Sequence, residues 1–222
     1  MTTITELVTA CLLEIERKYG TGDNDGESPK KYHNKEHTET VIADALKIAD
    51  LALERHKITL RQRELLHVAA AFHDIEQDSL EYGNELASAD IMDSMAASTQ
   101  LFSADELLEI REIILGTEIT IKQGVPTQVY AQSYLPQALA DADLAGLGKP
   151  TEIYTKNVYE KYCEELYPLQ RKEDRFAFLN QTVLLLKNHH FFTPEAEYLF
   201  QEQAENLRFV KELEENFEKS TN

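Results

Sequence analysis

The chain has 222 residues, which is long enough for one domain with a sizeable hydrophobic core. It carries 40 acidic and 22 basic side chains, and the formal net charge of −18 repels nucleic-acid phosphates and anionic membrane surfaces. Nucleic-acid polymers and membranes are therefore not expected as partners.

Three further features favour a cytoplasmic protein. The amino terminus lacks the basic start and continuous apolar stretch of a signal peptide. No apolar run approaches the roughly 18 residues that a membrane span requires. Cys11 and Cys163 have no metal-binding spacing, so we expect two free thiols in a reducing compartment.

Apolar residues recur with the helical period along most of the chain. The first helix begins after a capping box of Thr3 and Glu6 and stops at Gly20. A second places His37 near its start, and a third is capped by Thr59 and runs to about His73. Further helices are predicted in segments 84–98, 103–115 and 134–148, around Val158, around Leu179 and from Thr193 onward.

Strand-like alternation is confined to residues 117–130 at most. The sequence therefore predicts an all-α fold, a compact helical bundle that forms one domain over residues 1–222. Within it, residues from about 32 to 148 are expected to form the core around a site, with helices of 151–218 packed on that core.

Two short segments contain residues that could bind a metal. YHNKEHTETV, residues 32–41, places His33 and His37 four positions apart, and AAFHDIEQD, residues 70–78, contains His73 and Asp74. The latter pair ends a very apolar run, where two adjacent polar groups are costly to bury unless they are paired or bound to a cation. The histidine spacing also invites comparison with the zinc helix of metalloproteases, but Asn34 stands in place of its catalytic glutamate, so that class is rejected.

A fourth ligand is offered by LADADLAGLG, where Asp141 and Asp143 interrupt an apolar helix. Two positions correspond to roughly 200° around a helix axis, so only one of them can face a buried site. The apolar periodicity does not choose between the two carboxylates.

The order His37, His73-Asp74 and a late aspartate resembles the HD superfamily of metal-dependent phosphohydrolases. The resemblance extends roughly from Tyr32 to Gly148, and NELASA and DADLAGLG are similar to a bacterial branch of predicted phosphohydrolases. It implies an HD-type helical bundle in which His37, His73, Asp74 and one late aspartate are the metal ligands. In that family the last aspartate follows Ala or Cys and is followed closely by Leu, a context that fits Asp143 and leaves Asp141 as the alternative.

Residues 32–41 also resemble the Tyr-His-Asn-x-x-His-x-x-x-Val segment of cyclic nucleotide phosphodiesterases. This resemblance implies that His33 donates a proton and that His37 binds metal. Those enzymes have another histidine three residues after the aspartate, where this chain has Gln77, so we expect one tightly bound ion rather than two.

Two imidazoles and two carboxylates suit Mn²⁺, Mg²⁺, Ni²⁺, Co²⁺, Fe²⁺ or Zn²⁺. Such an ion activates water and polarises a phosphoryl oxygen, and His33, one helical turn from His37, could protonate the leaving oxygen. The expected function is therefore that of a metal-dependent phosphohydrolase, a phosphomonoesterase or a phosphodiesterase or pyrophosphatase. Its substrate is expected to be a small phosphate ester or a nucleotide.

Four other residues are secondary candidates for this site. Lys31 and Lys35, with Lys30 nearby, form a positive cluster that either guides a phosphate or balances neighbouring acids in a solvated loop. Asn84 and Glu85 are candidates for binding a water or for acid–base catalysis, although Glu85 also suits an exposed helix start.

Two other functions are compatible with the same motif. Some HD-type folds bind two irons and catalyse oxygenation, which requires extra histidines that Gln77 does not supply. A module that binds metal without turnover is the other alternative, and His33 beside the ligands argues against it. Structural roles are expected for His67, for His189 and His190, and for the tyrosines at positions 154, 159, 162 and 167.

Overall fold

The computed structural model describes residues 2–21, 26–79, 83–122, 124–128, 132–166 and 171–219. Its elements in chain order are α1 (Ile4–Tyr19), α2 (Lys35–Glu54), α3 (Leu60–Phe72), α4 (Asn84–Ala97), α5 (Ala104–Leu115), β1 (Ile119–Lys122), β2 (Val125–Gln128), α6 (Tyr134–Asp143), η1 (Ala145–Gly148), α7 (Thr151–Tyr154), η2 (Thr155–Tyr159), α8 (Glu160–Leu166), α9 (Lys172–Asn188), α10 (Pro194–Leu199) and α11 (Gln203–Lys219). The predicted all-α fold is confirmed. Within the described ranges, the antiparallel hairpin of β1 and β2 is the only sheet.

Helix starts are fixed by the side chains that the sequence indicates. α1, α3 and α5 each begin with a capping box, formed by Thr3 and Glu6, Thr59 and Gln62, and Ser103 and Glu106. α10 begins with Thr193, whose hydroxyl accepts a hydrogen bond from the backbone N–H of Ala196, and Pro194 occupies its first turn. Since these caps satisfy N–H groups that lack helical partners, they determine where each helix begins.

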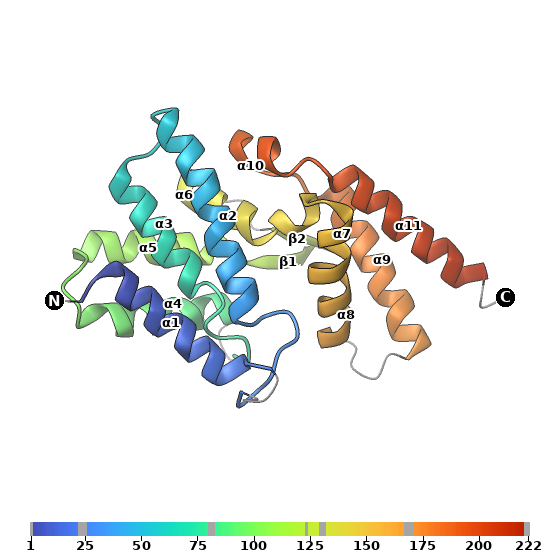
Figure 1. Cartoon of the computed structure of the whole chain (residues 1–222), viewed down its shortest axis with the longest axis horizontal. Helices are drawn as coiled ribbons and strands as arrows, with labels where there is room; N and C mark the ends of the chain where they lie inside the picture. The colour runs from blue at the N-terminus through green and yellow to red at the C-terminus, as the bar shows by residue number, and fades with distance from the viewer. Residues whose placement is uncertain are drawn as a thin grey trace.

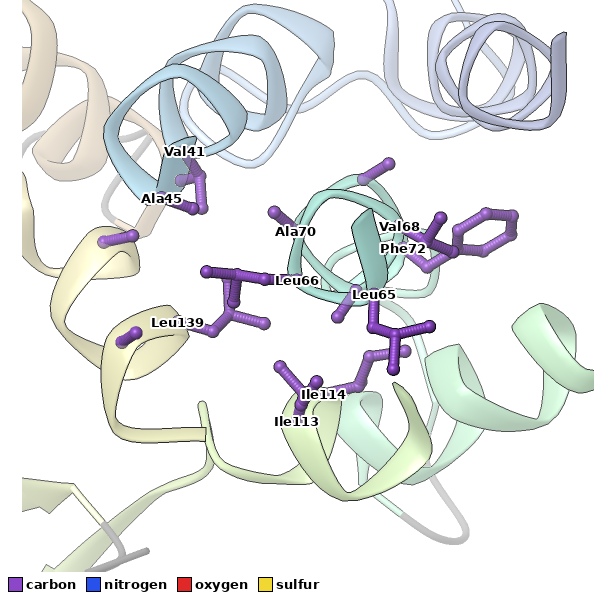
Figure 2. Packing of buried hydrophobic residues seen from close by; sticks show 14 of the residues in the cluster. Val41, Ala45, Leu65, Leu66, Val68, Ala70, Phe72, Ile113, Ile114 and Leu139 are labelled. Carbon is purple, nitrogen blue, oxygen red and sulfur yellow. The ribbon is translucent and has the colours of Figure 1, made fainter. Parts of the chain in front are cut away.

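The main hydrophobic cluster surrounds α3, which packs against α2, α5 and α6 (Figure 2). Leu66 of α3 points toward Leu139 of α6, and both side chains are fully buried. On another side of the same helix, Leu65 faces Ile114 of α5. Burial of each such side chain stabilises the fold by about 1.5–3 kcal/mol. α3 is thus held firmly on several sides at the end where His73 and Asp74 follow it.

A second cluster joins η1, α7, η2, α8, α9 and α11. These helices lie toward the carboxy-terminal end of the long axis, away from α1 and α3, while α10 returns to pack on α2 and α6 (Figure 1). Tyr154 and Tyr159 are buried in this cluster, and Tyr162 packs against it, in agreement with their predicted core role. Tyr167 lies outside the described residues. None of the described helices has both the length and the apolar composition that a membrane crossing requires.

Candidate metal centre

His37 lies in the first turn of α2, and Asn34 determines its position. The Asn34 side-chain oxygen accepts hydrogen bonds from the backbone N–H groups of Glu36 and His37 at 2.9 and 3.4 Å. Its amide nitrogen donates to the carbonyl oxygens of Lys30 and Lys31. Asn34 is therefore the N-cap of α2, a role that the comparison with metalloproteases did not reveal.

His73 and Asp74 follow directly after α3. His73 is buried, and its Nδ1 lies 2.9 Å from the carbonyl oxygen of Ala70, an acceptor that fixes the proton on Nδ1. The lone pair on Nε2 is then directed away from the helix, toward Asp74. This is the second-layer arrangement that histidine ligands of metals commonly use.

α6 presents Asp141 and Asp143 in different directions. Asp141 is fully buried, and its carboxylate accepts hydrogen bonds from the backbone N–H groups of Phe192 and Thr193, each 2.8 Å long, and from the Thr193 hydroxyl. These contacts anchor the start of α10. Asp143 instead turns toward His37 and His73, so the structure separates the two carboxylates that periodicity could not.

The four predicted ligands converge on one point. Nε2 of His37 lies 3.3 Å from Asp74 Oδ2 and 3.2 Å from Asp143 Oδ1, and Nε2 of His73 lies 3.2 and 3.5 Å from the same two oxygens. One ligand atom from each residue falls within 4.8 Å of all the others. The elements that bring them together are α2, the end of α3 and the end of α6.

The donor atoms fit a divalent cation. Ligands that lie about 2.0–2.2 Å from such an ion are separated from one another by about 3–4 Å, which is the spacing found here. Nε2 of His37, Nε2 of His73 and Oδ2 of Asp74 are buried and lack hydrogen-bond partners within the described residues. Buried polar atoms are rarely left without a partner, and a cation bound between these three atoms would supply one.

Burial and charge act against each other in this cluster. Burial disfavours the charged form of His37, but the facing carboxylates of Asp143 and Asp74 outweigh burial and raise the pKa of His37. Burial likewise opposes ionisation of Asp74, yet the positive field of His73 and His37 holds its pKa well below the usual range. The two carboxylates therefore stabilise positive charge at the centre.

His33 lies beside the cluster, held by a residue that the sequence did not indicate. Its Nδ1 contacts Oε1 of Glu165 on α8. Oε2 of the same carboxylate accepts hydrogen bonds from the backbone N–H groups of Tyr32 and His33, at 2.6 and 3.0 Å. Burial opposes ionisation of Glu165, but these hydrogen bonds lower its pKa. The His33 and His37 ring centroids are 5.8 Å apart.

Gln77 hydrogen-bonds to the candidate ligand Asp74. Its side-chain N–H donates to Asp74 Oδ1 at 2.8 Å, and its side-chain oxygen lies 3.5 Å from the amide nitrogen of Asn84. Asp74 therefore offers Oδ2 to the centre while Oδ1 is occupied by an amide donor. Asn84 is connected to the ligands through Gln77.

Glu85 is half-buried and lies within electrostatic range of the centre. Burial raises its pKa, and the negative charges of Asp74, Glu118 and Asp143 raise it further. A carboxyl group with a raised pKa near a centre of this kind has the properties of an acid or base, although geometry does not assign it a step.

Lys31 is exposed and Lys35 is half-buried, and neither lines the pockets described next to the cluster. Two other cations, Lys149 and Lys161, do line a small polar pocket of about 50 Å³ that also contains His37 and Asp143. Lys161 pairs with Glu36 at 2.7 Å. The structure thus places Lys149 and Lys161, rather than the predicted lysines, on the pocket wall.

The other histidines lie outside the cluster. Burial lowers the pKa of His67 and, with the charge of His190, lowers that of His189 to about 4. His189 is the C-cap of α9, and its ring meets Phe191 edge-on at 4.7 Å. These contacts agree with the structural role expected for His189.

Comparison of the chain with models of known families, with curated proteins and with solved structures gave no match. The candidate metal site therefore rests on the His and Asp residues themselves and on their arrangement in this fold.

Proposed function

We propose that the protein is a metal-dependent phosphohydrolase of the HD type. The observation that carries the proposal is the convergence of His37, His73, Asp74 and Asp143, with three buried donor atoms that lack other partners. A divalent ion bound there lowers the pKa of a coordinated water and polarises a phosphoryl oxygen. The substrate class is a small phosphate ester or a nucleotide.

His33 is the proton donor in this proposal. The Glu165 carboxylate accepts a hydrogen bond from Nδ1–H of His33, so the proton to be delivered is the one that Nε2 carries in the imidazolium form. Since Glu165 also accepts two backbone N–H groups, it holds the ring and the chain around it in one orientation. Glu165 is therefore a positioning residue, and His33 delivers a proton to the leaving oxygen.

One ion per chain is expected. The side-chain N–H of Gln77 already donates to Oδ1 of Asp74, so that carboxylate would offer Oδ2 to a single ion. Mn²⁺, Mg²⁺, Ni²⁺, Co²⁺, Fe²⁺ and Zn²⁺ all accept such a mixed nitrogen and oxygen set. Both cysteines are buried free thiols, which suits the reducing cytoplasm.

Asp74→Asn tests the proposal directly. The variant replaces one anionic ligand by a neutral amide and is expected to lose at least tenfold in metal affinity and its hydrolytic activity while it retains its helical circular dichroism. The measurements are elemental analysis after gel filtration and a metal-supplemented screen of phosphate esters.

The matched control is Asp78→Asn. Asp78 is four residues further along, and it pairs with Lys30 rather than with the centre. Its variant should retain both metal and turnover. Full metal content and full activity in Asp74→Asn would refute the assignment.

A further inference from the structure

A second cavity, of about 100 Å³, adjoins the metal centre on the side of His33. Tyr32, His33 and Asp143 form its rim toward the centre, and the remaining described lining comes from Leu144 and from β1, η1, α7, η2, α8 and α9. This lining comprises Ile119, Leu144, Gly146, Leu147, Tyr154, Val158, Tyr159, Tyr162, Phe178, Thr182 and Leu185. Its apolar lining comes mainly from the second hydrophobic cluster.

The wall away from the centre is mainly apolar, and its described side-chain polar groups are the hydroxyls of Thr182 and of the tyrosines at 154, 159 and 162. Among its described lining residues, the charged or titratable imidazole and carboxylate groups are His33 and Asp143, both at the rim. The Thr182 hydroxyl donates to the carbonyl oxygen of Phe178 at 2.8 Å, so its proton is already used within α9. A ligand with several hydroxyl or amide groups would lose hydrogen bonds to water here.

The wall also contains a helix irregularity. Residues 155–159 form a π-helical segment between α7 and α8, and such segments are frequent at functional sites. Val158 and Tyr159 of this segment line the cavity. Gly146 lies opposite, where an added Cβ would approach the Val158 side chain to 2.7 Å, so the glycine allows η1 and η2 to pack closely.

Because His33 lines this cavity, the proposed role of His33 indicates which part of the substrate the cavity receives. In the proposed reaction His33 protonates the oxygen that leaves phosphorus, so the carbon group on that oxygen must lie on the His33 side. His33 forms part of this cavity but not of the polar pocket that contains Lys149 and Lys161. The leaving group and the phosphate are thus assigned to different pockets.

We propose that the substrate is a phosphate monoester of a small apolar alcohol, whose carbon chain occupies this cavity. The inference rests on the proposed hydrolase function and selects among its substrate classes. The cavity volume of about 100 Å³ is below the roughly 150 Å³ of an apolar cavity that binds benzene, so it suits a short carbon chain rather than a nucleoside.

The test compares two esters that differ only in polarity. Propyl phosphate and glycerol 3-phosphate both have a three-carbon primary alcohol as the leaving group, but glycerol adds two hydroxyls. An apolar pocket discriminates against a hydroxyl by about 100-fold, so we expect kcat/KM to favour propyl phosphate by at least tenfold. Adenosine monophosphate is expected to be a poorer substrate than propyl phosphate.

The results separate this inference from the proposed function. Hydrolysis of glycerol 3-phosphate or adenosine monophosphate as fast as propyl phosphate would overturn the apolar substrate class and leave the hydrolase intact. Failure to hydrolyse any phosphate ester, with metal bound, would refute the hydrolase itself and the inference with it.

Neighbouring leucines of α9 supply a matched pair of variants. Leu185 lines the cavity, whereas Leu184 is half-buried and does not belong to its described lining. Leu185→Asn places an amide in the wall and should lower the preference for propyl phosphate over glycerol 3-phosphate about tenfold. Leu184→Asn should leave that preference unchanged.

The preference is a ratio of two kcat/KM values measured on the same preparation. Unfolded protein lowers both values equally, so partial unfolding of a variant does not change the ratio. An unchanged ratio in Leu185→Asn, or an equal change in both variants, would show that this cavity does not receive the leaving group.

Discussion

At the scale of single residues, His33 and Glu165 form the contact with the most direct chemical consequence. His33→Ala should retain metal and lower kcat by about 100- to 10,000-fold for alkyl phosphates, because their alkoxide leaving groups need a proton. The loss should be much smaller for p-nitrophenyl phosphate, whose leaving group is stable as an anion. Steady-state kinetics with both substrates, and elemental analysis, provide the measurement.

Glu165→Gln is the companion variant. The glutamine keeps a side-chain oxygen that can accept a hydrogen bond from the His33 ring. Its N–H group, however, would face the backbone N–H groups of Tyr32 and His33, which now donate to Glu165. We expect a smaller fall in kcat than in His33→Ala, with the same dependence on the leaving group. If either variant slows both leaving groups equally, His33 is not the proton donor.

The two partners of this contact differ in how they could be found. His33 lies four residues from His37 in a recognisable segment, so the sequence indicated it. Glu165 lies 132 residues further along the chain from His33, and nothing in its local sequence distinguishes it from other acids of the same helix. Long-range contacts of this kind depend on how α8 packs, which helical periodicity does not determine.

At the scale of elements, α6 carries the candidate metal ligand Asp143 and, two residues before it, the structural carboxylate of Asp141. Asp141→Asn should destabilise the fold by about 2 kcal/mol, because its amide N–H would face the donors of Phe192 and Thr193. Asp143→Asn should lose metal affinity instead, since it removes an anionic ligand. Chemical denaturation and metal titration of both variants measure the two effects.

Each variant is the control of the other. The assignment of roles would be wrong if Asp141→Asn lost metal while Asp143→Asn kept it. The sequence predicted that one carboxylate faces the site, since a two-residue step turns roughly 200°. The choice between the two carboxylates required the structure, because Asp141 accepts hydrogen bonds from the backbone N–H groups of Phe192 and Thr193, which lie far away in the sequence.

Helix starts were predictable for a local reason. Capping boxes involve residues three apart, so Thr3, Thr59 and Ser103 could be identified from sequence as helix starts. The positions of Lys149 and Lys161 on the polar pocket were not, because they depend on how η1 and α8 approach α2. Lys31 and Lys35 were predicted to contact a phosphate only because they are close to His33 and His37 in the sequence.

At the scale of the whole molecule, helical periodicity was sufficient for the all-α fold but not for its two hydrophobic clusters. Both clusters consist of apolar faces with the same period, and the sequence does not state which face meets which. The His33 contact with Glu165 and the pair of Glu36 with Lys161 join α8, from the second cluster, to the start of α2. The candidate site therefore depends on the packing of the whole chain.

His189 makes the stability of this assembly depend on pH. It lies between Leu186 of one cluster and Phe191 of the other, and burial, with the charge of His190, lowers its pKa from 6.5 to about 4. Below pH 6.5 the unfolded chain binds a proton that the folded chain does not accept until about pH 4. The folded state is thus fully stable with respect to His189 above pH 6.5, where the imidazole is neutral in both states, and it loses stability as the pH falls toward 4.

The loss corresponds to about 3 kcal/mol at 1.36 kcal/mol for each pH unit. His189→Phe removes the titrating group, so its free energy of unfolding should fall less between pH 6.5 and 4 than that of the unmodified chain. His190→Phe changes the exposed neighbour and should keep most of the dependence. Urea denaturation at several pH values measures the difference between these variants, in which the contributions of the metal ligands cancel. Parallel stability curves for His189→Phe and the unmodified chain would show that His189 is not the group responsible.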